Sequence, residues 1–274
     1  MLENLVQQVP MFLLVAVRCL TTMLFMPLLS SRNIHRRVKV ALAFYMAYFI
    51  FPQISFSSGP FSKYTQYISP TGNFNLDYIF LLIGEGMIGA ILGFFVQIIF
   101  AAFSTAGQFF AFQMGFSASE VYDALSQVEN PLMGQFFNFV AMLIFLQNHW
   151  FQKIFLNGLV TSFSTLNAFS IIEHSDSMAL FMMSSLTHLF RNALIIALPI
   201  MGTLFLINVT MGILSKAAPQ MNLLSEGFPI LILTAFLVIF LLLPYLCNFF
   251  EQSFNYSFEN LGRLFIELKQ EVSQ

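Results

Sequence analysis

Long apolar runs separated by short polar stretches follow one another through the whole chain. The main runs are 9–29, 77–112, 132–150, 178–216 and 230–247, with a shorter one at 40–52. A run of about 20 apolar residues is long enough to cross a bilayer as a helix. The pattern therefore predicts an all-α, integral membrane-type protein with about six apolar helical segments.

Proline and glycine punctuate these segments. We expect Pro199 to kink the run 178–216, and the last run to end around Pro244. Gly89 and Gly93 are spaced for a small-residue face that allows close helix packing. The residues expected to pack or kink helices are Gly89, Gly93, Pro199, Pro219, Gly227 and Pro229.

The sequence shows no division into repeats or separate domains. No segment resembles another closely enough to indicate a repeat, so residues 1–274 are expected to form a single domain. The tail, 251–274, contains four Glu, one Arg and one Lys. It predicts an amphipathic helix in water or at a membrane interface.

An acidic insert, residues 112–131, separates two apolar runs. It contains three carboxylates and no Lys or Arg. One interpretation is an ordinary loop in solvent, since loops usually lie at the surface. The other is a segment that enters a pore and closes it. The candidate plug residues are Gly115, Phe116, Glu120, Val121, Tyr122, Asp123 and Leu125.

Three charged residues lie in the interior of the apolar runs, away from their first and last residues, namely Arg18, Glu85 and Arg191. A charge in a membrane is costly unless it is paired, so these side chains are expected to face protein. Glu85 is open to two interpretations. It could carry a proton, or it could be the buried partner of an Arg such as Arg18 or Arg191.

Four basic residues gather near the end of the first apolar run. This basic cluster consists of Arg32, Arg36, Arg37 and Lys39. The positive-inside rule places it on the cytoplasmic side, with the N-terminus outside. The favoured interpretation is that the cluster only sets topology, and the alternative is that it also docks a partner.

The segment after the apolar run 132–150 is mixed in character. His149 and Trp150 are expected to be interfacial anchors. Residues 151–177 contain several Ser and Thr and predict a short surface helix.

Composition limits the possible functions. The chain is 58% hydrophobic and only 9% charged, whereas soluble domains contain about 25% charged residues. Lipid or a large protein partner must cover this apolar surface. A net charge of −2 gives no reason to expect nucleic acid, and Cys19 and Cys247 are expected to be packing residues.

No constellation for catalysis or ligand binding is visible. The four His residues are scattered, and no recognisable nucleophile, metal or phosphate motif occurs. Residues 84–89 spell a formal GxGxxG, but no strand precedes it, so it carries no weight as a nucleotide motif. The sequence predicts no enzyme activity, no cofactor and no metal.

Several motifs, taken in order, resemble one family. They are Arg18 with Phe25-Met26-Pro27; Gly89, Gly93, Phe94, Ala101-Ala102, Thr105-Ala106-Gly107 and Gln113-Met114-Gly115; Asn148-His149; Ala197-Leu198-Pro199, Asn208, Gly212, Leu214, Ala218-Pro219-Gln220-Met221-Asn222 and Gly227-Phe228-Pro229. Together they resemble the FliR family of flagellar biosynthetic proteins and its injectisome counterpart, the T component of type III secretion. The chain departs from the family at Gln108, where Glu is usual, and at Asn167, where Pro is usual.

This resemblance implies a structural subunit of the flagellar type III export gate, in the bacterial inner membrane at the flagellar basal body. P-like and Q-like subunits would be its partners, with B-like and A-like export components beside them. Unfolded flagellar proteins would pass through the channel, and the acidic insert would help to close it. The resemblance also implies bent helical hairpins, stacked above the plane of the bilayer.

Two alternatives from the sequence stay open. An injectisome export subunit would share the same motifs. A small-solute secondary transporter would suit broken helices and charges within apolar runs, although it would be expected to show internal repeats.

Overall fold

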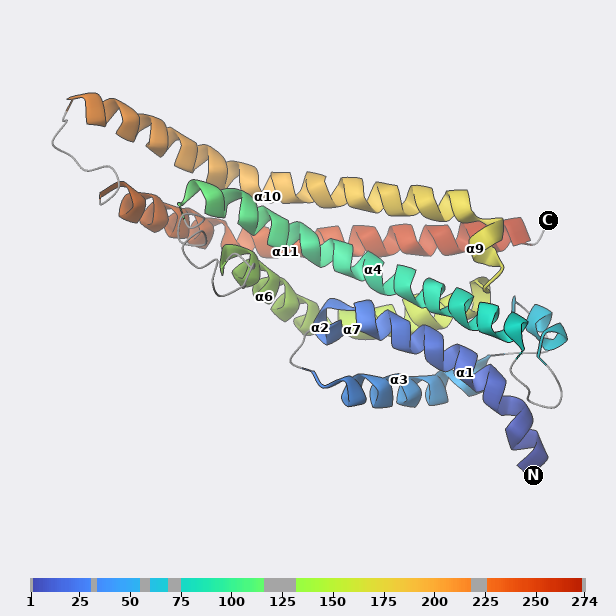
Figure 1. The fold of residues 1–274 in the computed structure, drawn as a ribbon. Helices are drawn as coiled ribbons and strands as arrows, with labels where there is room; N and C mark the ends of the chain where they lie inside the picture. The colour runs from blue at the N-terminus through green and yellow to red at the C-terminus, as the bar shows by residue number, and fades with distance from the viewer. Residues whose placement is uncertain are drawn as a thin grey trace. The chain divides into compact units, whose positions relative to one another are not determined.

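The computed structural model describes residues 2–30, 34–54, 60–68, 75–115, 132–217 and 226–272. Regular structure in these ranges is helical, with no strand among them (Figure 1). Four described helices are long and apolar enough to cross a membrane, and a fifth, α6, is apolar but shorter. The prediction of an all-α, membrane-type fold is confirmed.

The chain forms two compact units. The first contains residues 1–98, 149–185 and 257–274, and the second contains 99–148 and 186–256. Three long helices contribute to both: α4 (Leu76–Gln113), α10 (Ser175–Ala217) and α11 (Phe228–Val272). Because these helices are shared, the division does not decide whether the chain is one domain, and the single domain stays a prediction.

The first unit is built from the N-terminal helices and from a series of short helices in the middle of the chain. Its elements besides the shared helices are α1 (Leu2–Phe25), α2 (Pro27–Ser30), α3 (Arg36–Ile50), η1 (Phe51–Gln53), η2 (Pro60–Gln66), α7 (Trp150–Lys153), the π-helix η3 (Ile154–Val160), α8 (Thr161–Thr165) and α9 (Ser170–Glu173). α1 packs against α3, where the Phe12 ring lies 5.9 Å from Phe44 and 5.6 Å from Phe51.

Two glycines of α4 permit a close approach to α1. A Cβ at Gly89 would overlap the Thr21 side chain and the Arg18 carbonyl, and a Cβ at Gly93 would lie 2.5 Å from the Thr22 carbonyl oxygen. Only glycine fits where two helix backbones come this close. The structure thus places both glycines at the kind of contact that their spacing predicts.

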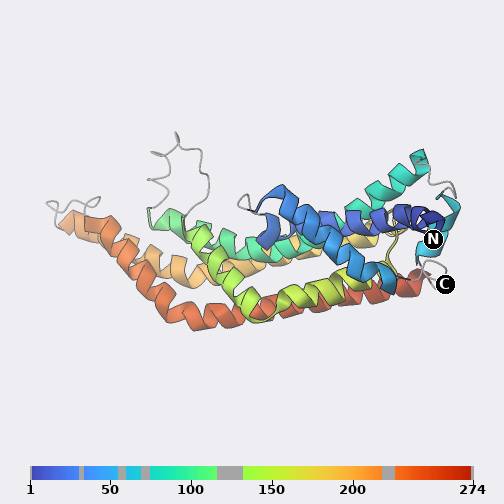
Figure 2. The ribbon, with the colours of Figure 1, turned by 90° about the horizontal axis from the view of Figure 1, so that it is seen from below.

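The second unit contains α6 (Leu132–Gln147) and the remaining parts of the shared helices. In Figure 2 α6 approaches α11, and phenylalanine rings fill the space between helices of this unit. The Phe103 and Phe250 centroids are 4.4 Å apart, and those of Phe145 and Phe254 are 5.4 Å apart. A second glycine contact joins α4 to α6, because a Cβ at Gly107 would lie 2.8 Å from the Gly134 backbone.

One predicted helix end is wrong. α11 continues through Pro244, so the tail beyond residue 251 extends α11 instead of forming a separate helix. α10 likewise contains Pro199, where the sequence predicted a kink and not an end. Proline removes one backbone hydrogen bond and crowds the carbonyl four residues earlier. A long helix that is packed on both sides of the proline tolerates that local loss.

Three further expectations are corrected. Arg36, Arg37 and Lys39 belong to the first turn of α3 and not to a loop, and Arg32 lies outside the described residues. Trp150 is 1% exposed, so it is a core residue and not an interfacial anchor. The segment 151–177 is not a single surface helix, because it folds into short helices with several buried polar side chains.

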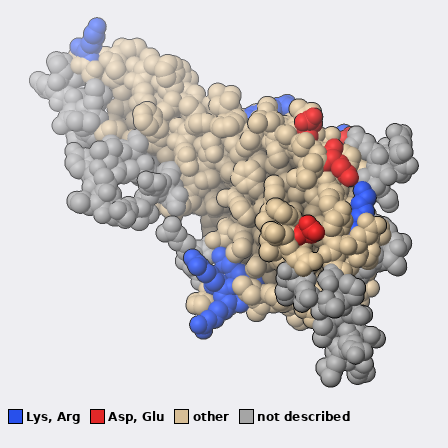
Figure 3. All heavy atoms as spheres, turned by 45° about the vertical axis from the view of Figure 1, so that its right-hand side comes forward, with Lys and Arg blue, Asp and Glu red and all other residues tan. Residues whose placement is uncertain are grey.

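Charged side chains are sparse on the surface. Figure 3 shows one face on which most of the described area carries neither basic nor acidic groups. Large apolar side chains are exposed on several helices, including Leu206 and Phe240. This surface needs lipid or protein to cover it.

Candidate functional site

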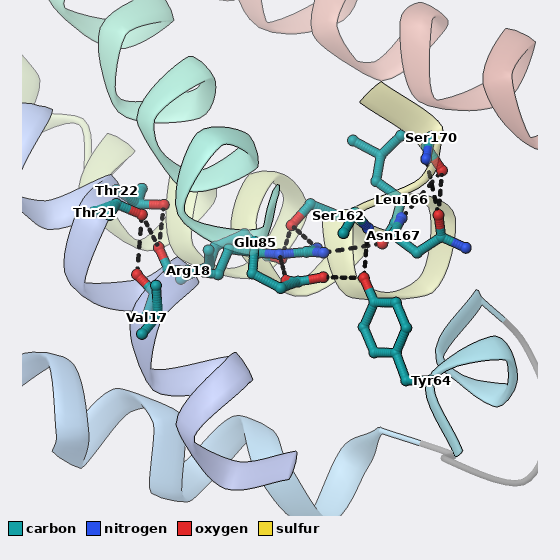
Figure 4. A network of polar contacts seen from close by, with 12 residues as sticks. Val17, Arg18, Thr21, Thr22, Tyr64, Glu85, Ser162, Leu166, Asn167 and Ser170 are labelled. Carbon is teal, nitrogen blue, oxygen red and sulfur yellow. Dashed lines mark hydrogen bonds and ion pairs between the residues drawn. The ribbon is translucent and has the colours of Figure 1, made fainter. Parts of the chain in front are cut away.

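The side chain of Arg18, from α1, is completely buried in the first unit. Its Nε donates a hydrogen bond to Glu85 Oε2 of α4 at 2.6 Å, and both side chains of this ion pair are 0% exposed. Nη1 donates to Ser162 Oγ at 3.1 Å, and Nη2 donates to the Leu166 carbonyl at 3.0 Å. Every guanidinium nitrogen therefore has an acceptor within the protein (Figure 4).

The second oxygen of Glu85 is bound as well. The Tyr64 hydroxyl, from η2, donates to Glu85 Oε1 at 2.5 Å, and the backbone N–H of Ala168 donates to the Tyr64 oxygen. Burial raises the pKa of Tyr64, and the adjacent Glu85 carboxylate raises it further. The phenol is consequently a neutral donor that holds the carboxylate.

The turn after α8 presents the acceptors to Arg18. α8 ends at Thr165, and Leu166 has extended backbone angles of φ −120° and ψ 142°, which free its carbonyl from the helix. Asn167 stabilises this turn, since its Oδ1 accepts the Ser170 N–H at 2.9 Å and its Nδ2 donates to the Pro60 carbonyl at 3.1 Å. The residue that departs from the family pattern is thus the one that connects this turn to η2.

Two aromatic rings cover the guanidinium. The Arg18 Cζ atom lies 4.3 Å from the centroid of Phe163 and 5.6 Å from that of Phe61. A cation over a ring face gains electrostatic attraction, more so when water is excluded. We use the name Arg18 cluster for Arg18, Tyr64, Glu85, Ser162 and Leu166.

The geometry of the Arg18 cluster favours a structural role. A proton carrier must exchange its proton with water, whereas Glu85 is fully buried and both of its oxygens accept hydrogen bonds. Removing one partner of such a pair leaves an uncompensated buried charge, which is strongly destabilising. The cluster therefore fixes α1, α4, η2 and the turn after α8 to one another.

Arg191 is not part of this cluster. It belongs to α10 in the second unit, where it is exposed and forms no ion pair with any described residue. Of the two arginines considered as partners of Glu85, the structure selects Arg18.

The base of the acidic insert lies in the second unit. Gly115, two residues beyond the end of α4, has a φ of +82°, a left-handed conformation that favours glycine. A Cβ at this position would also overlap the Phe228 ring. Phe116, Glu120, Val121, Tyr122, Asp123 and Leu125 lie outside the described residues.

The two helices that flank the insert are held together close to its base. The ring centroids of Phe110 in α4 and Phe137 in α6 are 5.3 Å apart. Two buried side-chain oxygens in the same region, Gln113 Oε1 and Asn138 Oδ1, have no hydrogen-bond donor among the described residues. The described residues on the two sides of the insert, in α4 and α6, are thus in direct contact.

The other residues expected to pack or kink helices lie in the second unit or outside the described residues. Pro199 and Pro229 are exposed, whereas Gly227 is buried, and a Cβ there would overlap the end of Met211. Pro219 lies outside the described residues.

Sequence reasoning missed Tyr64, Ser162 and Leu166. Tyr64 lies in a polar stretch without periodicity, and Leu166 contributes only its backbone. The one available signal was the unusual density of Ser and Thr at 161–165. Such hydroxyl groups could have been considered as partners for the charges that lie within the apolar runs.

The all-α fold, the long apolar helices and a dry ion pair that joins them define an integral membrane-type protein. Comparison with known families refines this class. Residues 9–257 match the family described as bacterial export proteins, family 1. The chain belongs to this family.

Individual relatives agree with that assignment. The chain is 30% identical over 269 residues to the flagellar biosynthetic protein FliR of Pectobacterium carotovorum subsp. carotovorum, covering 97% of this chain and 96% of the relative. It is 26% identical over 265 residues to FliR of Bacillus subtilis (strain 168), covering 96% and 97%. The surface presentation of antigens protein SpaR of Shigella flexneri is 32% identical over 162 residues, covering 59% and 62%.

Proposed function

We propose that this chain is a structural, non-catalytic subunit of the flagellar type III protein-export gate, located in the bacterial inner membrane at the flagellar basal body. One observation carries the proposal: the match to flagellar biosynthetic relatives extends over nearly the whole of both chains. The similarity to SpaR covers a smaller part of each chain, and this favours the flagellar role over an injectisome role.

A hetero-oligomeric assembly fits the exposed surface. Leu206 and Phe240 are exposed on α10 and α11, together with many other large apolar side chains. P-like and Q-like subunits would cover part of this surface, and B-like and A-like export components would join the assembly. Unfolded flagellar proteins would pass through the resulting channel.

Co-expression tests the partnership. Expressed alone, the chain should be aggregated or degraded, and co-expression with P-like and Q-like subunits should yield a monodisperse complex. A stable monomer or homo-oligomer in detergent would favour the transporter alternative and would contradict the gate.

The acidic insert is proposed to close the channel. A channel wide enough for an unfolded chain leaks ions unless a movable segment seals it. The helices that flank the insert contact each other through Phe110 and Phe137, so they would stay together while the segment between them moves. Its carboxylates would oppose permanent burial, because an unpaired buried charge is costly.

Deletion of residues 117–127 tests closure. The complex carrying the deletion should assemble normally, and cells expressing it should lose membrane potential and take up small dyes. A same-length replacement of 117–127 by Gly and Ser is the matched control for loop length. It should leak too, because it lacks the apolar side chains of the seal. An assembled, ion-tight deletion complex would assign the seal to the partner subunits.

A further inference from the structure

α3 presents two different faces. One face packs into the first unit through Ala43, Ala47 and Ile50, which are buried. The opposite face exposes aromatic side chains, with Tyr45 61% and Tyr48 69% exposed. Such large aromatic groups seldom remain open to water on a packed helix, so this outer face is expected to have an occupant.

The outer face is basic at one end and uncharged along the rest. Arg37, Ala41, Tyr45 and Tyr48 are spaced four, four and three residues apart, so they line one side of the helix. Arg36 precedes Ala43 by seven residues, so it is in line with the packed face, but it is exposed at the N-terminal end of α3 next to Arg37. Neither arginine forms an ion pair with any described residue. Between Glu3 and Asp77 the sequence contains no acidic residue.

Among the described residues, neither arginine has an acidic partner. On the face drawn in Figure 3, a group of Lys and Arg atoms lies apart from the Asp and Glu atoms. The occupant of the outer face must therefore supply anionic groups at the Arg36 and Arg37 end and apolar or amphipathic surface at the Tyr45 and Tyr48 end.

The length of α3 restricts how a bilayer could provide both the anionic groups and the apolar surface. Its 15 residues extend over about 22 Å, which is less than the ~30 Å of a hydrocarbon core. Tyr side chains are enriched at the membrane–water interface. Helices that lie in the interface combine a large apolar side chain on one face with Lys or Arg that contact anionic headgroups.

We propose that the outer face of α3 binds the surface of an anionic phospholipid bilayer. Arg36 and Arg37 contact lipid phosphates, while Tyr45, Tyr48 and Phe49 lie at the boundary between headgroups and acyl chains. A bilayer surface supplies phosphates for the arginines and apolar groups for the aromatic side chains, side by side. This surface is separate from the acidic insert and from the Arg18 cluster.

Fluorescence quenching by brominated lipid tests the contact on the full chain in its co-expressed complex with P-like and Q-like subunits. Trp150 is the only tryptophan of this chain and is buried, and the complex that contains the parent chain supplies the background. Tyr48→Trp places a second indole on the outer face. We expect brominated phosphatidylglycerol to quench this indole at much lower concentration than brominated phosphatidylcholine, and added salt to reduce the difference.

Charge variants, each carried in the Tyr48→Trp chain, then identify the arginines as the source of the preference. Arg36→Gln with Arg37→Gln should weaken phosphatidylglycerol binding about 30-fold, since each basic residue near an anionic surface contributes about 1 kcal/mol, or about fivefold. Arg36→Lys with Arg37→Lys should retain the preference. Lys153→Gln with Arg263→Gln is the matched control, because both side chains are exposed in the first unit and the same charge is removed.

Three results would overturn the proposal. They are an absence of quenching beyond that of the parent protein, an unchanged phosphatidylglycerol preference in the Arg36→Gln, Arg37→Gln chain, and an equal loss in the control. A photo-crosslinker at Tyr48 in the assembled complex in cells separates the possible occupants. Crosslinking to lipid supports the bilayer surface, and crosslinking to a protein subunit refutes it.

Discussion

Removing one member of the buried ion pair should destabilise the protein far more than removing both. In Arg18→Leu the Glu85 carboxylate stays buried with only Tyr64 as donor, and in Glu85→Leu the guanidinium loses its only anionic partner. Breaking a buried pair on one side typically costs about 3–5 kcal/mol. In a chain of this size, each kcal/mol lowers the melting temperature by roughly 2–4 °C, so each single variant should melt roughly 6–20 °C lower.

The double variant Arg18→Leu, Glu85→Leu removes both charges at once. Replacing a buried pair by apolar side chains is often neutral or stabilising. Here it leaves the neutral acceptors Ser162 and Leu166 without their donor, which costs roughly 1–3 kcal/mol per buried group. We expect a total cost that is several kcal/mol below the sum of the single variants.

Cys19 provides the assay. Its thiol is fully buried next to Arg18, so a thiol-reactive fluorogenic dye reports unfolding of the first unit with temperature. A Cys247→Ser background removes the only other cysteine. The exposed pair Lys63–Glu173, at 3.3 Å with side chains 54% and 46% exposed, is the matched control. An exposed pair should show coupling of at most about 1 kcal/mol.

Additivity would refute the reasoning. If the double variant costs the sum of the singles within about 0.5 kcal/mol, Arg18 and Glu85 do not stabilise each other. A coupling no larger than that of Lys63–Glu173 would lead to the same conclusion.

Three further predictions concern packing, topology and pH. Gly89→Leu should abolish assembly and leave membrane insertion intact, because overpacking of this helix contact costs about 1–3 kcal/mol. Gly202→Leu, with open space around its Cβ, should assemble normally on a blue native gel, and equal behaviour of the two would place Gly89 outside a tight contact. Changing the whole basic cluster to Glu should invert or scramble the first hairpin, as measured by thiol labelling of cysteines placed at Ser30 and Ser58; unchanged labelling would show that packing sets topology. The raised pKa of Tyr64 means that the folded phenol keeps its proton while the unfolded one loses it near pH 10, so thermal stability should fall as pH rises above about 10, and Tyr64→Phe should flatten that fall, whereas an identical profile would exclude Tyr64.

Local patterns in the sequence were sufficient to predict the long helices. Apolar runs predicted the long helices, and the cost of charge in such runs predicted that Arg18 and Glu85 need partners. The spacing of Gly89 and Gly93 pointed to a close helix contact, and the structure places α1 against both. Each of these inferences depends on residues within a few turns of one another.

Nonlocal contacts were beyond sequence reasoning. Glu85 is 67 positions from Arg18, and Ser162 is 144 positions away. Nothing in the local pattern around Tyr64 or Leu166 marks them as partners of this pair. The helix end expected around Pro244 was wrong for a related reason, because α11 buries Ile239 before this proline and Leu246 and Phe250 after it.

Those separations have a consequence for the newly made chain. At roughly 5–20 residues per second of synthesis, Glu85 emerges about 3–13 s after Arg18, and Ser162 emerges about 7–30 s after it. Until then the guanidinium must be kept in water, held by insertion factors or paired temporarily with another group. The ribosome thus finishes the first apolar helix long before that helix can take its final place. Arg18 cannot be buried with all its partners until more than half of the protein has been translated.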